Sequence, residues 1–180
     1  MTKFLYFIRS ASSYHPLGFP IEESVLINKG LTQCKDFKKY SIYADLVLTS
    51  PLIRSLQTTD IIFKDHSNII ALDSLKHMSS PPKIKNKLFI QKYPNIIFHN
   101  NDINIKEFYK NCDFDDDQNM NKRIEQTKKF ITSRPISEQQ IAIVGHNTYL
   151  TMFMNYISKN KNITFTDKNL EHCCPYILKF

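Results

Sequence analysis

The amino-acid sequence predicts an α/β fold in three layers, with helices packed on both faces of a mostly parallel sheet. Short apolar runs rich in Val, Ile, Leu and Phe recur along the chain, as is typical of strands buried on both faces. Segments with apolar residues at helical spacing lie between these runs, and this alternation favours parallel strands joined by helices. The chain has 180 residues without an internal repeat or a linker, so we expect one domain over residues 1–180.

The first strand and the first helix are predicted near the N-terminus. Residues 3–8 (KFLYFI) are mainly aromatic and branched apolar residues, which indicates a buried strand that ends at Arg9. A loop with two prolines and a glycine follows. Apolar residues at helical spacing then predict a helix within residues 22–40, most clearly from Leu31 onward, with Gly30 as a turn near its start.

A second strand, a second helix and a third strand come next. Residues 44–49 (ADLVLT) form another buried run. Ser50 and Pro51 then indicate a helix start, because serine caps free N–H groups and proline fits the first helical position. The helix is expected over residues 52–63, and residues 68–72 (NIIAL) form the third short strand.

The middle of the chain is harder to assign. Residues 73–87 have no clear period and contain two adjacent prolines, which exclude regular structure there. Three aspartates within residues 113–117 have the spacing of a calcium-binding loop, but Gln118 and Ile124 stand where that loop needs Gly and Glu. We therefore expect an acidic first turn that precedes a helix over residues 118–133.

The last elements follow a strong apolar run. Residues 140–144 (QIAIV) predict a strand, the tripeptide GHN a turn, and residues 148–158 a helix. After a loop rich in Asn and Lys, residues 175–180 predict the last strand.

The charge of the chain permits several kinds of partner. The net charge is +7, which would attract phosphates, nucleic acids or anionic surfaces. The lysines are scattered and form no run of five or more, and no DNA- or RNA-recognition motif is present. We therefore expect a basic, solvated surface and no nucleic-acid partner, although nucleic-acid binding stays as an alternative hypothesis.

The cysteines and the N-terminal segment suggest an intracellular protein without a bound metal. The four cysteines lack CxxC spacing, so neither a zinc site nor a disulfide framework is predicted, and we expect reduced thiols: Cys34, Cys112, Cys173 and Cys174. The apolar run FLYFI is far shorter than a membrane span or a secretory signal. We expect a cytoplasmic protein that has no contact with a membrane and needs no cofactor.

Polar residues that suit phosphate follow three of the predicted strands. Arg9 and Ser10 end the first strand, Arg54 lies one turn into the helix after the second strand, and His146 follows the QIAIV strand. The carboxyl ends of parallel strands form the usual ligand crevice of α/β folds. Guanidinium groups pair with phosphate oxygens and an imidazolium can donate a further hydrogen bond. The sequence therefore predicts a phosphate-binding site at this edge of the sheet.

The segments that carry these residues resemble a known family. TSPLIRSLQTT, with Arg54 inside it, looks like the phosphate-binding motif of the histidine phosphatase (phosphoglycerate mutase-like) superfamily. The resemblance extends to FLYFIRSASS, NKGLTQC and IAIVGHNTYL. It implies a phosphoglycerate mutase-like fold and a hydrolase that works through a phosphohistidine. In that family a first His attacks phosphorus, two Arg and a second His hold the phosphoryl oxygens, and a carboxylic acid protonates the leaving group.

Matching the residues to the family pattern gives three agreements and two departures. Arg9, Arg54 and His146 match the phosphate-binding residues. Ser10 stands at the position of the nucleophilic His, and His77 stands where the family usually shows the acidic residue. His77 is still a candidate general acid, because the usual histidine pKa of about 6.5 lies near working pH.

The serine leads to our main hypothesis about function. A serine hydroxyl needs a nearby base to become a nucleophile, and arginine cannot accept a proton. Loss of a nucleophile can cost on the order of 10⁶-fold in turnover, whereas phosphate binding depends on other residues. We therefore expect a catalytically impaired protein, a pseudoenzyme that binds or senses a phosphorylated small molecule or phosphoprotein.

An active phosphatase is the main alternative. In that case His146 would activate Ser10, or His15 or His77 would replace the missing nucleophile. A variant of this alternative is that Ser10 is an engineered change of a natural histidine. The candidate catalytic residues are thus Ser10, His77 and His146, and the candidate phosphate ligands are Arg9, Arg54 and His146.

Overall fold

The structure is a computed structural model, and it describes residues 2–14, 24–77, 92–99, 117–159, 165 and 170–180. The strands are β1 (Phe4–Arg9), β2 (Ser13–Tyr14), β3 (Val25–Leu26), β4 (Leu46–Thr49), β5 (Ile69–Leu72), β6 (Ile96–His99), β7 (Gln140–Gly145) and β8 (Pro175–Lys179). The α-helices are α1 (Asn28–Asp36), α2 (Ile53–Ile62), α5 (Asp117–Ser133) and α6 (Asn147–Ser158), and the 3₁₀ helices are η2 (Phe37–Tyr40) and η3 (Asp73–Leu75).

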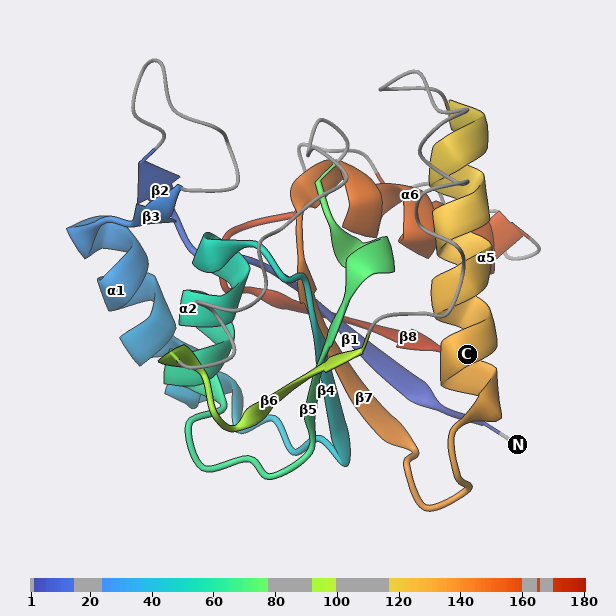
Figure 1. Ribbon diagram of the computed structural model, residues 1–180, viewed down its shortest axis with the longest axis horizontal. Coiled ribbons are helices and arrows are strands. Elements are labelled where there is room, and N and C mark those ends of the chain that lie inside the picture. The colour runs from blue at the N-terminus through green and yellow to red at the C-terminus, as the bar shows by residue number, and fades with distance from the viewer. Residues whose placement is uncertain (1, 15–23, 78–91, 100–116, 160–164, 166–169) are drawn as a thin grey trace.

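One sheet forms the centre of the molecule, and its strand order is β6-β5-β4-β7-β1-β8 (Figure 1). Four neighbouring pairs are parallel, and only β8 runs antiparallel to its neighbour β1. β7 lies between β1 and β4, with Arg9 opposite Gly145 and Thr49 opposite Val144. The carboxyl ends of these three strands therefore meet at one edge of the sheet.

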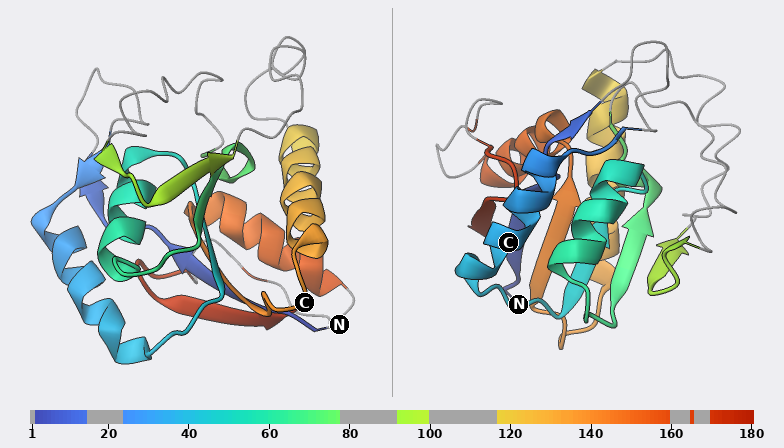
Figure 2. Two further views of the ribbon diagram at one scale, coloured as in Figure 1. Left: turned by 60° about the horizontal axis from the view of Figure 1, so that its bottom comes forward. Right: turned by 90° about the vertical axis from the view of Figure 1, so that its left-hand side faces the viewer.

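The helices cover both faces of the sheet, as the sequence predicts. Figure 2 shows α1 and α2 on one side and α5 and α6 on the other. Side chains alternate along each strand, so that Leu46 and Leu48 of β4 join the core beneath α5 and α6. Val47 between them joins the core beneath α1 and α2. The three-layer α/β arrangement follows from this alternation.

Several element predictions are confirmed by the structure. The strands predicted over residues 3–8, 44–49, 68–72, 140–144 and 175–180 appear as β1, β4, β5, β7 and β8. The helices predicted over residues 52–63, 118–133 and 148–158 appear as α2, α5 and α6. Of the three aspartates with calcium-loop spacing, Asp113 and Asp115 lie outside the described residues, and Asp117 is the first residue of α5. None of the helices in the described part of the chain is long and apolar enough to cross a membrane.

Other predictions need correction. The helix predicted within residues 22–40 begins only at Asn28, because Val25 and Leu26 pair with Ser13 and Tyr14 in a small hairpin. Pro51 is not the first residue of α2, which starts at Ile53, although Ser50 Oγ does accept the N–H of Leu52 at 3.3 Å. These local patterns were overridden by pairing with distant parts of the chain.

The sheet contains one strand that the sequence analysis missed. Residues 96–99 (IIFH) form β6, which pairs in parallel with β5 at the edge of the sheet. Ile96 is buried, whereas Ile97 is exposed. The short branched and aromatic run was a usable signal, but no strand was predicted between the irregular residues 73–87 and the aspartates of residues 113–117.

Gly30 fixes how α1 approaches the end of β1. A Cβ atom at this position would lie 2.2 Å from the carbonyl oxygen of Ser12, a distance that no side chain can occupy. The N–H of Ile27 also donates to this oxygen at 3.2 Å. Glycine thus allows α1 to pack directly against the segment that follows Arg9.

Candidate phosphate-binding site

Arg9 reaches the site from the end of β1. Its Nη1 donates a hydrogen bond to the carbonyl oxygen of Leu170 at 2.9 Å. The next N–H, that of Ser10, donates to the carbonyl oxygen of Gly145 at 2.8 Å. These bonds fix residues 9 and 10 beside the end of β7, where the strand gives way to His146.

A buried chain of hydrogen bonds joins Arg54, His146 and Ser50. Arg54 is 7% exposed, His146 3% and Ser50 0%. Nη2 of Arg54 lies 3.0 Å from Nδ1 of His146, and Nε2 of His146 lies 2.8 Å from Oγ of Ser50. Arginine only donates, so Nδ1 of His146 accepts and the ring proton sits on Nε2, which donates to Ser50.

His146 is neutral in this arrangement. Burial holds the pKa of His146 well below its usual value, and the charges of Arg54, His77 and Arg123 lower it further. The sequence analysis instead assumed an imidazolium as a donor to phosphate. The difference arises because the ring is buried beside Arg54, His77 and Arg123, a tertiary arrangement that sequence spacing cannot show.

These residues line one cavity of about 480 Å³. The lining includes three cations, Arg9, Lys29 and Arg54, and three imidazoles, those of His77, His146 and His172. Several serines and Asn147 complete its polar part, and no Asp or Glu occurs among the described lining residues. The described part of the wall therefore carries net positive charge, and the N-terminus of α6 adds partial positive charge from the helix dipole.

His77 follows η3 and enters the cavity beside His146. The two rings meet edge to face, with centroids 5.4 Å apart and an interplanar angle of 78°. Arg123 of α5 fixes the segment before His77, because its Nε donates to Ser74 O at 3.1 Å and its Nη2 donates to Lys76 O. The side chain of Lys76 is buried and pairs with Asp73 at 3.2 Å.

Thr127 links η3 to the two helices that cover this face. Its hydroxyl oxygen lies 2.8 Å from Oγ of Ser74 and 2.6 Å from the hydroxyl of Tyr149. The guanidinium of Arg123 stacks over the Tyr149 ring, 5.2 Å from its centroid. The position of His77 is thus set by a buried polar network and not by the irregular sequence around it.

His172, which precedes β8, lies at the site but was not among the predicted site residues. Its Nδ1 lies 2.5 Å from the carbonyl oxygen of Ser10, and its ring lines the cavity. Lys29 of α1 is a second cavity residue that was not singled out. Nothing in the local sequence EHCCP marks His172, because its partner lies 162 residues earlier in the chain.

Comparison with solved structures finds proteins of similar fold. No family model matches the sequence, and no curated protein matches it. A phosphoglycerate mutase from Bacillus anthracis superposes on 99% of this chain and 88% of its own, with a TM-score of 0.65 and 13% identity. This chain has a phosphoglycerate mutase-like fold. The resemblance read from the sequence motifs therefore agrees with the architecture.

Two phosphatase structures share the phosphoglycerate mutase-like fold. The alpha-ribazole phosphatase from Shigella flexneri matches 97% of this chain and 89% of its own, with a TM-score of 0.62 and 16% identity. A mutant phosphoserine phosphatase from Entamoeba histolytica, in complex with phosphoserine, also covers 97% and 89%, with a TM-score of 0.60 and 19% identity. At such low identity the likeness extends to the fold alone.

Within this phosphoglycerate mutase-like fold, all five predicted site residues lie at the same cavity: Arg9, Ser10, Arg54, His77 and His146. Their roles stay predictions. His15, which was considered as an alternative nucleophile, lies outside the described residues. No group of His, Cys, Asp or Glu side chains in the described part of the chain is arranged to hold a metal ion.

Proposed function

We propose that this chain is a histidine phosphatase-like protein that binds a phosphorylated ligand in the cavity at the end of β1, β4 and β7. The observation that carries the proposal is the charge of the cavity, which has two arginines and a lysine in its wall and no described carboxylate. A phosphoryl group carries up to two negative charges and accepts bidentate hydrogen bonds from guanidinium groups. The ligand would neutralise the positive charge of the wall.

The second part of the proposal is that turnover is impaired because Ser10 occupies the position of the usual nucleophile. Ser10 is buried, and its main chain is hydrogen-bonded to Gly145 and His172. His146 is a poor base for it, since Nδ1 already accepts from Arg54 and Nε2 carries the proton. This arrangement argues against the alternative in which His146 activates Ser10.

The size of the cavity favours a small ligand. A volume of about 480 Å³ lies within the range of small-molecule sites. The Entamoeba histolytica phosphoserine phosphatase structure contains phosphoserine, which is a phosphomonoester of this size class. We propose a phosphorylated small molecule as the main ligand, and a phosphorylated side chain of a partner protein would present the same phosphoryl group.

The test compares the native chain with Ser10→His. Titration with inorganic phosphate or vanadate measures binding, and release of phosphate from an aryl phosphate measures turnover. We expect the native protein to bind both anions with negligible hydrolysis, and Ser10→His to gain hydrolysis because imidazole is a nucleophile without an added base. Robust hydrolysis by the native protein would contradict the impairment, and absence of anion binding would contradict the site.

A further inference from the structure

His172 lies beside the main chain of Ser10 although the two residues are far apart in sequence. It forms an isolated parallel bridge with Arg9, and the N–H of Cys173 donates to the carbonyl oxygen of Arg9 at 2.9 Å. The ring of His172 is held by its contact with the carbonyl oxygen of Ser10 at 2.5 Å. An imidazole therefore enters the cavity next to the residue at which the family pattern would place one.

The hydrogen bond to Ser10 defines which ring nitrogen carries the proton. A carbonyl oxygen only accepts, so Nδ1 of His172 is the donor and keeps its hydrogen. Burial lowers the pKa of His172, and the charges of Arg9 and Lys29 act in the same direction against the hydrogen bond to Ser10. The neutral ring has its lone pair on Nε2, and none of the described residues hydrogen-bonds to that nitrogen.

The other buried imidazole of the cavity has the opposite arrangement. Nδ1 of His146 accepts from Arg54, and its Nε2–H donates to Ser50. Both nitrogens of His146 are therefore engaged with the protein. His172 instead combines a fixed Nδ1–H with an unprotonated Nε2, which is the form in which imidazole is nucleophilic.

We propose that Nε2 of His172 accepts a phosphoryl group from an activated phosphoryl donor, such as an acyl phosphate or phosphoramidate, bound in the cavity. This inference rests on the proposed phosphate site. In the acyl phosphate reaction the Nε2 lone pair attacks phosphorus, the N–P bond forms and the P–O bond to the acyl group breaks. The carboxylate leaves with the electron pair of that bond and needs no proton. From phosphoramidate, whose nitrogen is already protonated near neutral pH, the P–N bond breaks and ammonia leaves with its electron pair.

The surroundings of His172 suit this transfer. The ring becomes cationic as the N–P bond forms, and its Nδ1–H remains on the carbonyl oxygen of Ser10. Arg9 is bridged to His172 through the backbone, and with Arg54 it would hold the oxygens of the transferred group.

Release of the phosphoryl group to water is expected to be slow. Hydrolysis would be assisted by a carboxylate that deprotonates water, and the described lining has none. Among the described lining residues, an alcohol leaving group would also find no carboxylic acid to protonate it. Phosphorylation of His172 by an activated donor is therefore compatible with negligible turnover of ordinary phosphomonoesters, and the modified protein should persist long enough to be isolated.

The experiment incubates the full chain with acetyl phosphate or phosphoramidate and locates the label by mass spectrometry under alkaline conditions. We expect one acid-labile phosphoryl group on His172, and loss of that label in His172→Asn, whose amide can still donate to Ser10. His99, an exposed histidine on β6, serves as the internal measure of non-specific labelling. Label on Ser10 or His77 in place of His172 would overturn the inference.

Two further measurements keep the result interpretable. Excess inorganic phosphate should slow labelling of His172 in the native protein and leave labelling of His99 unchanged, a readout that needs no variant. Phosphate titration of the same sample separates the two proposals. If phosphate binds but His172 is not labelled above His99, this inference fails and the proposed function stands. If phosphate does not bind, the proposed function itself fails.

Discussion

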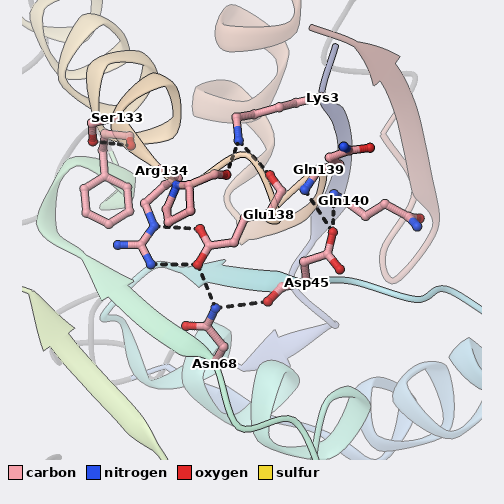
Figure 3. Close-up of polar contacts among 10 residues, drawn as sticks. Lys3, Asp45, Asn68, Ser133, Arg134, Glu138, Gln139 and Gln140 are labelled. Atoms are coloured by element: carbon pink, nitrogen blue, oxygen red, sulfur yellow. Dashed lines mark hydrogen bonds and ion pairs between the residues drawn. The ribbon is translucent and has the colours of Figure 1, made fainter. Parts of the chain in front are cut away.

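The two ends of the central sheet use the same kinds of side chain in opposite ways. At the amino end of the strands, Arg134 donates to both carboxylate oxygens of Glu138, at 2.6 and 2.7 Å (Figure 3). Asn68 donates to Glu138 as well, at 3.1 Å. Asp45 accepts the N–H groups of Gln139 and Gln140 at 2.9 and 2.8 Å. Each of these charges is balanced inside the protein.

The carboxyl end is organised around cations and neutral acceptors. Arg9 donates to a backbone carbonyl and Arg54 to a neutral imidazole. The cavity between them has no carboxylate among its described residues. An arginine that pairs with a carboxylate of its own chain stabilises the fold, whereas Arg9 and Arg54 lie in a cavity wall where an anionic ligand can meet them.

The strongest test of this contrast replaces one arginine from each end. Arg54→Ala should weaken phosphate binding by about 2–5 kcal/mol, on the order of 30-fold or more, because a buried charge that faces the ligand is lost. Arg134→Ala should leave phosphate binding unchanged and lower the free energy of unfolding, since Glu138 loses its bidentate partner. Isothermal titration and thermal unfolding of both variants provide the measurements. Equal loss of binding in both would refute the division of roles.

A second prediction concerns acid stability at the amino end. The hydrogen bonds from Arg134, with help from Asn68, hold the pKa of Glu138 below its usual value. The ionised carboxylate therefore stabilises the fold above the unfolded-state pKa, and this contribution is lost as pH falls through the lower folded-state value. Glu138→Gln should lower the free energy of unfolding by about 1.5–3 kcal/mol near neutral pH, and by less in acid.

A glutamate with a weaker partner supplies the control for Glu138. Glu125 of α5 is 40% exposed and lies 3.8 Å from Lys128, so Glu125→Gln should change stability by less than about 1 kcal/mol. Denaturant unfolding from acid to neutral pH measures both variants. A difference between Glu138→Gln and the native protein that stayed constant with pH would show that ionisation of Glu138 does not stabilise the fold.

The smallest expected effect is a pH dependence of anion binding at the carboxyl end. Burial and nearby cations hold the pKa values of His146 and His172 below the usual range. A bound dianion offsets those cations and raises both pKa values, so binding takes up protons in the interval between the free and bound values. Sulfate affinity should therefore rise as pH falls, by at most about tenfold per pH unit for each proton taken up.

Sulfate is suited to this measurement because it stays dianionic near neutral pH, unlike phosphate. Calorimetry in buffers of different ionisation enthalpy reports the protons taken up. His172→Asn should reduce the uptake, and Arg134→Ala should not. Sulfate binding without proton uptake across about pH 5 to 8 would mean that the bound anion does not raise the pKa values of these histidines.

Much of the fold could be predicted because its signals are local. Buried runs such as residues 140–144 and the helical spacing of residues 118–133 marked β7 and α5 in advance. The strand-end rule for parallel sheets then grouped Arg9, Arg54 and His146 correctly at one cavity. The hairpin of β2 and β3 was missed, since two-residue strands exist only through their pairing.

The features of the site also divide into those that local sequence shows and those that depend on tertiary contacts. The sequence alone determined which side chains follow the strands, that Ser10 comes directly after Arg9, and that the chain is basic. Only the tertiary structure decided that His172 meets Ser10, that His146 is neutral with Nε2–H toward Ser50, and that the cavity wall lacks a described carboxylate. Hydrogen-bond direction and burial depend on distant partners, which local sequence patterns do not specify.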